Sequence, residues 1–243
     1  MSKVQQQAEN WSASFAGVPP PDHVDLWRTP VTIESDIAAL TRGLSHQEQA
    51  RAARFRFAAD RTAFITAHAM LRSVLAQYVG DAPDQLAFTA GPHGKPELAA
   101  PRGIAFNLSH SAGWSVCAVA RVPVGIDIEA REARTGAGDV LRMLAPPERA
   151  ELEALTGAAQ VAALARIWTR KEAVMKATGL GMALPLANFV VSAEDPPRVV
   201  RFDGGDADAW SLRGFAPSPS IVGTVAVLAP LAADGLRRFA WAP

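Results

Sequence analysis

Two acidic side chains stand two residues apart in the run Val124-Gly-Ile-Asp-Ile-Glu129. The alternating pattern predicts a strand, on which Asp127 and Glu129 project from one face while Ile126 and Ile128 face the core. Neighbouring carboxylates repel each other unless solvent or a cation separates them, and Mg²⁺ accepts one or two carboxylates together with phosphate oxygens. The motif by itself fits either a magnesium site or an amphipathic strand with a wet acidic face.

A third acidic residue lies in the segment Ile167-Trp-Thr-Arg-Lys-Glu-Ala-Val-Met-Lys-Ala177. On a helix, Glu172 and Lys176 stand four residues apart and share one face. Such a pair is common on protein surfaces, where it contributes roughly 0.3–0.5 kcal/mol. Trp168 lies one turn earlier on the same face, and a tryptophan is unusual on a fully solvated stripe. We therefore expect this face to be half-buried and to line a cleft.

Polar side chains gather in Phe106-Asn-Leu-Ser-His-Ser111, at the end of a predicted strand. Hydroxyl, amide and imidazole groups placed there can donate hydrogen bonds to phosphate oxygens. The alternative is a polar turn in which Asn107 and Ser109 bond to the local backbone. A serine hydrolase fits poorly, because adjacent strand residues face opposite ways and the sequence has no Gly-x-Ser-x-Gly motif.

A turn rich in glycine and proline, Gly91-Pro-His-Gly-Lys-Pro-Glu97, presents Lys95. Glycine permits close approach of the backbone to a ligand, and proline makes the turn rigid. Two arginines, Arg51 and Arg54, belong to a helix predicted to start after Ser45, where Ser45-His-Gln-Glu matches a capping box. Taken one at a time, these cations are typical of a solvated surface.

The composition narrows the class of protein. The chain has 243 residues, 49% of them hydrophobic, and 24 basic residues balance 24 acidic ones. This balance argues against a nucleic-acid-binding protein, which usually has a basic excess. The single cysteine, Cys117, lies in an apolar run and has no partner for an internal disulfide. Without a signal-peptide pattern or an apolar run of about 20 residues, we expect a cytoplasmic protein that does not enter a membrane.

The elements that must position these residues can be read from periodicity and turn signals. Helices are expected from Ser45, over 60–78 with a stop at Gly80, from Pro146, and over 158–178 with a stop at Gly179. Strands are expected at 23–27, 85–89, 103–108, 114–121, 124–129, 189–193, 199–202, 210–215, 221–228 and 236–241. Strands and helices do not alternate regularly, which predicts an α+β fold. Residues 1–21 are expected to form a flexible extension, and residues 130–139 a mobile loop.

Taken in order, the motifs resemble those of a known family. Gly94-Lys-Pro96, then Asn107 to Ser111, then Gly125 to Glu129, then Trp168 to Lys176 is similar to the 4′-phosphopantetheinyl transferase superfamily, in its Sfp-type, single-chain branch. The resemblance covers about 45–185. It implies a monomer made of a pseudo-twofold pair of similar α+β halves, here 22–122 and 123–243, with coenzyme A in the cleft between them.

The resemblance also implies roles for individual residues. Mg²⁺ would be bound by Asp127, Glu129 and Glu172, and Lys176 would contact the pyrophosphate of coenzyme A. Ser109 and His110 would contact phosphate groups of coenzyme A, His110 chiefly the 3′-phosphate. The adenine nucleotide would lie beside Gly94, Lys95 and Pro96. The 3′-phosphate would also be contacted by Arg51 and Arg54.

The implied reaction moves phosphopantetheine to a carrier protein. A carrier serine attacks the β-phosphate of coenzyme A and 3′,5′-ADP leaves, with Glu172 as the base, either directly or through a metal-bound water. Two alternatives stay open: an acyltransferase that uses the coenzyme A thioester, and a module that only docks carrier proteins. The sequence does not indicate whether the carrier is acyl or peptidyl, nor whether it serves fatty-acid, polyketide or nonribosomal-peptide synthesis. The loop 130–139 and the helix after it are plausible docking places.

Overall fold

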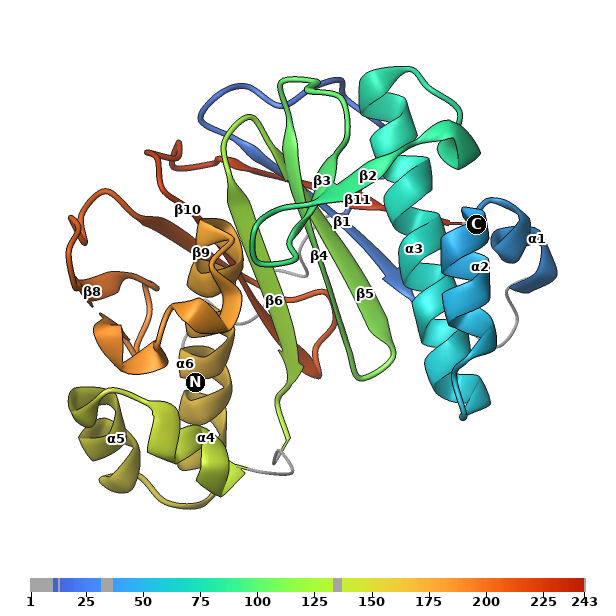
Figure 1. Cartoon of the computed structure of the whole chain (residues 1–243). Coiled ribbons are helices and arrows are strands. Elements are labelled where there is room, and N and C mark those ends of the chain that lie inside the picture. Colours follow the sequence, from blue (N-terminus) through green and yellow to red (C-terminus); the bar gives the residue numbers. More distant parts are fainter. Residues whose placement is uncertain (1–10, 13, 32–36, 133–136, 243) are drawn as a thin grey trace.

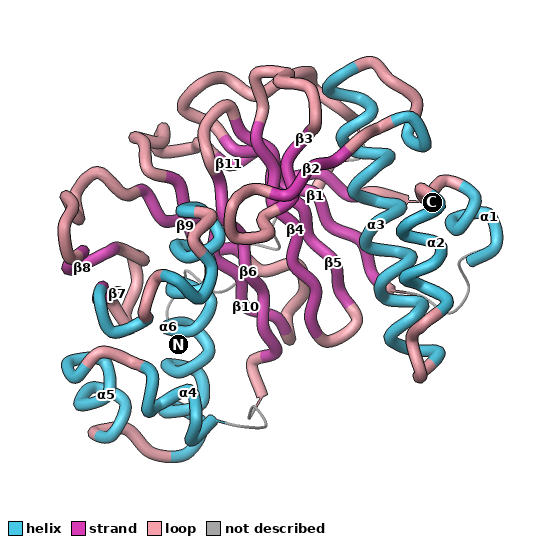
Figure 2. Tube along the Cα trace, viewed as in Figure 1, coloured by secondary structure: helices cyan, strands magenta, loops and turns pink. Residues whose placement is uncertain are grey.

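The computed structural model describes residues 11–12, 14–31, 37–132 and 137–242. Helices α1–α3 lie on one side of a central set of strands and α4–α6 on the other (Figures 1 and 2). The helices are α1 (Ile37–Arg42), α2 (His46–Ala53), α3 (Ala58–Val79), α4 (Ala137–Met143), α5 (Pro146–Glu153) and α6 (Gly157–Thr178). The strands are β1 (Val24–Pro30), β2 (Phe88–Ala90), β3 (Pro96–Leu98), β4 (Ala105–Ser111), β5 (Trp114–Ala120), β6 (Val124–Ala130), β7 (Phe189–Val191), β8 (Val199–Phe202), β9 (Ser211–Phe215), β10 (Ile221–Val227) and β11 (Leu236–Ala240). The expected α+β class is confirmed.

Two sheets carry most of the strands. The first has the order β11-β1-β5-β4 and the second the order β6-β10-β9, while β2-β3 and β7-β8 form separate hairpins. Apolar residues of both sheets, including Leu26, Val116, Ile126 and Val225, share one core cluster. Cys117 is fully buried among the residues between β5 and α3, as its apolar setting predicts. Where the two sheets meet, the edge strand β4 of the first sheet lies beside the edge strand β6 of the second.

The two long helices end in the same way. Helix α3 stops at Gly80 and α6 at Gly179, both in the left-handed conformation with φ of 79° and 71°. Glycine adopts this conformation without steric cost, which makes it the usual residue after a helix. The sequence predicts both ends correctly because this signal is local.

An ion pair between a glutamate and a buried cation is repeated in the two parts of the chain. Glu48 of α2 pairs with Arg72 of α3 at 2.6 Å, and Glu148 of α5 pairs with Lys171 of α6 at 2.9 Å. Each cation also donates to two backbone carbonyls of the segment that follows its helix: Arg72 to Pro83 (2.7 Å) and Leu86 (3.0 Å), Lys171 to Leu186 (2.6 Å) and Phe189 (2.6 Å). The repeat is one of structure and not of sequence, since the two cations differ in type.

The prediction that residues 1–21 form a flexible extension is wrong for the part that the structure describes. Ser12 bridges to Phe239 of β11, and Trp11 packs edge-on against Phe215. Phe15 contacts the ring of Tyr78 at 4.9 Å between centroids. These aromatic side chains bury apolar area, which outweighs the polar character of the segment. Residues 1–10 and Ala13 lie outside the described residues.

The last strand also departs from the expected division of the chain. We assigned residues 123–243 to one half, but β11 pairs in parallel with β1 of the first sheet. A parallel neighbour can come from any distance along the chain, so no local pattern reveals it.

Smaller differences concern element boundaries. The strand expected at 85–89 begins at Phe88, because Pro83–Gln85 is a 3₁₀ turn. The strand expected at 103–108 extends to Ser111, which places His110 inside β4. Helix α4 occupies the end of the expected loop 130–139, of which 133–136 lie outside the described residues. Among the described residues, no helix has the length and apolar character needed to cross a bilayer.

Candidate active site

Side chains, and not a backbone ladder, connect β4 to β6. Alternate residues of β4 reach across to β6, since every second side chain of a strand points to the same side. The three contacts, which we call the β4–β6 seam, are Ile126 N to Asn107 Oδ1 (2.9 Å), Ser109 Oγ to Asp127 Oδ1 (2.9 Å) and Ser111 Oγ to Glu129 Oε2 (3.1 Å). The alternative of a polar turn, with Asn107 and Ser109 bonded to the local backbone, is therefore wrong. These residues join the two sheets.

Asp127 is the most buried carboxylate of the seam, with 5% of its surface exposed. Its Oδ1 accepts hydrogen bonds from Lys176 Nζ at 2.6 Å and from Ser109 Oγ at 2.9 Å, whereas its Oδ2 is buried without a hydrogen-bond partner. Burial raises the pKa of Asp127, and the nearby Lys176 ammonium and Ser109 hydroxyl oppose that rise. A buried carboxylate oxygen without a donor is costly and favours a site that receives a cation.

Helix α6 covers the acidic face of β6. Trp168, Glu172 and Lys176 are all half-buried, as their shared helical face predicts. Besides Asp127, Lys176 Nζ reaches the carbonyl of Ile126 at 3.2 Å and Ser109 Oγ at 3.4 Å. The alternative of a fully solvated acidic face is wrong for Asp127, which this helix covers, while Glu129 is half-buried.

Gly125 allows that close packing. A Cβ atom at this position would lie 2.0 Å from the carbonyl oxygen of Ala173 and 2.3 Å from the amide nitrogen of Ala177. Real Cβ atoms do not approach backbone this closely, so only glycine permits β6 to touch the backbone of α6. The acidic motif alone indicated no role for Gly125. A glycine inside an otherwise apolar strand is the signal that could have revealed it.

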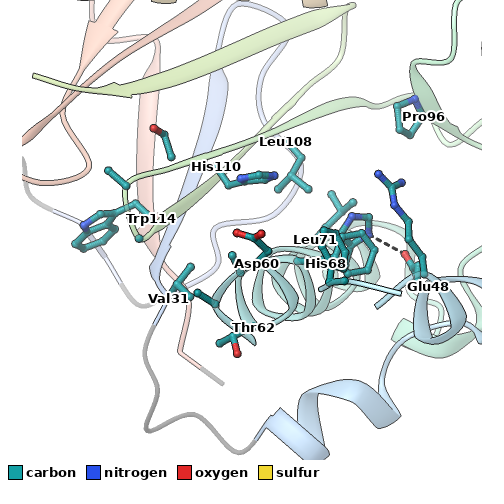
Figure 3. A pocket seen from close by; sticks show the side chains of 18 of the residues that line it. Val31, Glu48, Asp60, Thr62, His68, Leu71, Pro96, Leu108, His110 and Trp114 are labelled. Atoms are coloured by element: carbon teal, nitrogen blue, oxygen red, sulfur yellow. Dashed lines mark hydrogen bonds and ion pairs between the residues drawn. The ribbon is translucent and has the colours of Figure 1, made fainter. Parts of the chain in front are cut away.

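A groove of about 1100 Å³ lies between α3 and the β4–β5 hairpin. Figure 3 shows Asp60 and His68 on the α3 side, His110 on the strand side and Pro96 at one end. Its volume is slightly above the usual range for small-molecule sites, about 300–1,000 Å³. Three of the expected coenzyme A contacts line it: Arg51, Pro96 and His110.

The walls of the groove affect the ionisation of His110. Partial burial lowers the pKa of its imidazole, and the positive charges of Lys176 and His68 lower it further, while Asp60 acts in the opposite direction. His110 thus lies in electrostatic reach of both the seam and the α3 wall. Two seam residues, Asn107 and Ser111, also line the groove, so the groove adjoins the seam.

One wall of the groove contains residues that sequence analysis did not select. Glu48 accepts hydrogen bonds from Ser45 N (2.8 Å), His68 Nδ1 (3.0 Å) and Arg72 Nε (2.6 Å). Burial alone would raise the pKa of Glu48, but these hydrogen bonds outweigh it and lower the pKa to about 2. The capping box of Ser45 and Glu48 forms as predicted and was the sequence signal that could have drawn attention to Glu48. That Glu48 also lines the groove depends on tertiary contacts.

The remaining expected coenzyme A contacts lie outside the groove lining. Lys95 Nζ donates to the carbonyls of Val124 (2.9 Å) and Ala177 (3.4 Å), and burial lowers its pKa to about 8, although Glu97 opposes this. Gly94 forms the turn before it with φ of 83°. Arg54 is the exposed C-cap residue of α2. Lys95 thus ties the β2–β3 turn to β6 and α6, and its contact with a nucleotide stays a prediction.

The amino-acid sequences of the two parts of the chain match two different family models. Residues 27–122 match the model described as 4′-phosphopantetheinyl transferase, N-terminal, and residues 123–226 match that of the 4′-phosphopantetheinyl transferase superfamily. The chain belongs to the 4′-phosphopantetheinyl transferase superfamily. The two matches meet between the strands β5 and β6, directly before the acidic motif of the seam.

Individual transferases of the superfamily are similar to this chain over about two thirds of their length or more. The 4′-phosphopantetheinyl transferase HetI of Nostoc sp. is 36% identical over 213 residues, covering 85% of this chain and 88% of that protein. A 4′-phosphopantetheinyl transferase of Bacillus subtilis is 32% identical over 157 residues, covering 64% and 69%. The transferase Sfp of Bacillus subtilis is 30% identical over 149 residues, covering 61% and 66%. This chain is therefore a transferase of the Sfp-type branch.

The expected metal ligands of the transferase are only partly gathered. Asp127 and Glu129 share the seam, while in the described part of the chain no three Asp, Glu, His or Cys side chains are grouped as a ready metal site. The donor set nevertheless fits a hard cation, because two carboxylates are adjacent and Asp127 Oδ2 has no hydrogen-bond partner. The role of Glu172 as third ligand stays a prediction.

Proposed function

We propose that this transferase moves the 4′-phosphopantetheine group of coenzyme A to a serine hydroxyl of an apo carrier protein, acyl or peptidyl, and releases 3′,5′-ADP. One observation carries the proposal: the Lys176–Asp127–Ser109 cluster lies at the seam of the two sheets, next to a groove large enough for a nucleotide. A cation and a hydroxyl donor beside such a groove suit a diphosphate joined to a nucleoside.

Coenzyme A would lie along the groove and the seam. The adenine nucleotide would occupy the groove, where Arg51, Pro96 and His110 line the walls. Its diphosphate would lie at the seam, near Lys176 and Ser109. Contacts of Gly94 and Lys95 to the nucleotide, and of Arg54 to the 3′-phosphate, belong to the same proposal but lie outside the lining of the groove.

Mg²⁺ would be held by Asp127, Glu129 and Glu172. When bound, it would neutralise negative charge on the diphosphate and on the departing 3′,5′-ADP. Support comes from the Asp127 oxygen that has no hydrogen-bond partner and from Glu129 on the same strand face. Such ions commonly combine one or two carboxylates with phosphate oxygens.

The residues of the chain supply the remaining chemistry. Lys176 carries a positive charge that compensates the charge growing on the leaving phosphate. Glu172, one turn before it on α6, accepts the proton of the attacking serine directly or through a water. Holding the phosphate in line with the serine hydroxyl raises the rate of transfer further, since phosphoryl chemistry depends mostly on positioning and charge.

The fold supports binding between two similar halves. The repeated ion pairs Glu48–Arg72 and Glu148–Lys171 are consistent with a pseudo-twofold arrangement, and the seam lies where the two parts meet. We propose that the protein acts as a monomer in the cytoplasm, as the resemblance implies.

The experiment is intact-mass spectrometry of several apo carrier proteins incubated with the transferase, coenzyme A and Mg²⁺. Each accepted carrier should gain one phosphopantetheine at its serine, and 3′,5′-ADP should appear in equal amount. Labelling should stop when EDTA removes the metal and return when Mg²⁺ is restored. Transfer of an acyl group from acyl-coenzyme A in the presence of EDTA, without phosphopantetheine transfer, would instead establish the acyltransferase alternative.

A further inference from the structure

The turn between β2 and β3 carries a lysine whose charged group is bound inside the protein. Lys95 is half-buried, and its Nζ donates to the carbonyl oxygens of Val124 (2.9 Å) and Ala177 (3.4 Å). Burial lowers the pKa of Lys95 to about 8, so the ammonium has lost hydration that a lysine on a solvated turn would keep. The two hydrogen bonds compensate part of this loss, and both go to the second part of the chain.

The first of these carbonyls belongs to the edge of β6 that faces β4. The amide of Ile126 donates to the Asn107 side chain and its carbonyl accepts from Lys176, so the backbone groups of Ile126 face β4 and not β10. Every second residue of a strand turns its backbone groups to the same side, which places the Val124 carbonyl on this edge too. Side chains therefore hold this edge in place of a backbone ladder, and Lys95 holds its first residue.

The second carbonyl, that of Ala177, belongs to the last turn of α6. Carbonyls in that turn have no partner within the helix, and a cation beside them interacts favourably with the helix dipole. The stem of Lys95 also packs on the C-cap residue of α6, since a Cβ atom at Gly179 would lie 3.5 Å from Lys95 Cδ. Lys95 thus caps α6 from outside the helix.

Both contacts of Lys95 lie where β6 and α6 come close together. Gly125, the second residue of β6, packs directly on the backbone of Ala177. Asp127 lies two residues after Gly125, and Lys176 directly precedes Ala177. The 2.6 Å ion pair between Asp127 and Lys176 therefore depends on the relative position of β6 and α6, which Lys95 joins.

We propose that Lys95 is a positioning residue, which links the start of β6 to the end of α6 and thereby holds Asp127 and Lys176 in place for transfer. The inference rests on the proposed function, to which it adds a role for the first part of the chain in the geometry of the second. The ammonium of Lys95 acts within the protein and does not bind the nucleotide. Gly94 and the backbone of Lys95 remain available to the adenine nucleotide.

Kinetics and calorimetry of Lys95→Met test the proposal. Methionine keeps an apolar stem and removes the ammonium donors. We expect kcat for carrier labelling to fall roughly 10- to 100-fold, because small displacements of reacting groups have effects of this size. The KM for coenzyme A and the affinity for 3′,5′-ADP should change less than about twofold. The control Arg102→Met removes an exposed cation that pairs with Asp81 and should leave kcat unchanged.

Two results of these measurements would overturn the proposal. One is a kcat of Lys95→Met equal to that of the parent. The other is a large loss of affinity for 3′,5′-ADP with an unchanged kcat, which would make the Lys95 ammonium a nucleotide ligand.

Chemical restoration of the ammonium separates positioning from a general loss of stability. Lys95→Cys alkylated with 2-bromoethylamine regains an amine at nearly the length of lysine. Cys117 is fully buried, and burial raises the pKa of its thiol, so only the introduced cysteine should react. The amine should restore most of kcat, whereas iodoethane, which adds a stem without a donor, should not. Equal activity after both treatments would contradict a role of the ammonium.

Amide hydrogen exchange of the ligand-free protein tests the link without any reaction. Exchange in the last turn of α6 and at the start of β6 should be at least about 10-fold faster in Lys95→Met than in the parent, because both segments lose a tether. Unchanged exchange in both segments would overturn the proposal. A parent that labels no apo carrier protein would contradict the proposed function, and faster exchange in Lys95→Met would still support the link between β6 and α6.

If neither variant of Lys95 folds, NMR of the parent decides. A scalar coupling between Lys95 Nζ and the carbonyl carbon of Val124 reports their hydrogen bond directly. A coupling that persists when 3′,5′-ADP is bound supports the proposal. Loss of the coupling on binding of 3′,5′-ADP overturns it, because the ammonium would then have moved to the nucleotide.

Discussion

Lys176 Nζ lies 2.6 Å from Asp127 Oδ1, so an ion pair joins helix α6 to strand β6 at the seam between the two sheets. The same oxygen accepts a hydrogen bond from Ser109 of β4. One carboxylate therefore connects a helix and a strand of the second part of the chain to a strand of the first. Because the candidate site is shared in this way, substitutions that shift either part should affect activity.

Removing a proposed metal ligand should abolish labelling of a carrier protein. We expect Asp127→Ala and Glu172→Gln each to lower the rate at least about 100-fold, as loss of a preorganised electrostatic group does. Intact-mass spectrometry with coenzyme A and Mg²⁺ measures the effect. The control Asp234→Asn changes an exposed carboxylate in the turn before β11 and should leave the rate unchanged. Full activity in either site variant would exclude that residue from the magnesium site.

Adding one methyl group at Gly125 should separate α6 from β6. The new Cβ in Gly125→Ala would meet backbone atoms of Ala173 and Ala177, so the helix must move. We expect a loss of about 3 kcal/mol in the free energy of unfolding, together with reduced transfer activity. Urea unfolding and the carrier assay measure the two effects.

Gly138→Ala is the matched control for this substitution. Its new Cβ meets no atom within 4 Å, and the stability change should stay below about 1 kcal/mol. If both alanine variants were equally stable, the close contact at Gly125 would not limit the packing of α6.

His110 should contribute to discrimination between coenzyme A and its 3′-dephospho analogue. We expect the ratio of kcat/KM values for the two substrates to fall about 10-fold in His110→Ala, because one hydrogen-bond donor to the phosphate is lost. Steady-state kinetics with both substrates gives the ratio. A ratio equal to that of the parent would remove His110 from the 3′-phosphate site.

Glu48 should stabilise the protein in a pH-dependent way. Its folded pKa of about 2 is below the ordinary value of 4.5. The stabilisation is thus present above about pH 4.5 and is lost as the pH falls toward about 2. Near pH 7, we expect Glu48→Gln to lose about 2 kcal/mol in the free energy of unfolding, after allowing for partial exposure to the groove.

Urea unfolding at a series of pH values measures this loss. The difference between parent and Glu48→Gln should shrink steadily below about pH 4.5. Glu151→Gln, an exposed change on α5, serves as the control and should show no such trend. A difference that stays constant down to about pH 3 would mean that the ionisation of Glu48 does not stabilise the fold.

Sequence patterns located most secondary-structure elements because the signals are local. The glycines after α3 and α6, the capping box at Ser45 and the alternation of β6 each depend on residues a few positions apart. The half-buried face of α6 followed from the spacing of Trp168, Glu172 and Lys176 alone. The packing of Trp11 and Phe15 could not be predicted, since their partners lie far along the chain.

By itself, the sequence determined the α+β class, the family and the residue types that carry the chemistry, because ordered motifs and periodicity are properties of the chain alone. Only the tertiary structure decided which of these groups meet. It paired Asp127 with Lys176 and Ser109, placed β11 beside β1, and brought His68 into the groove that His110 also lines. Contacts of this kind depend on how distant elements pack, and the packing is set by the shared core and by the close approach that Gly125 allows.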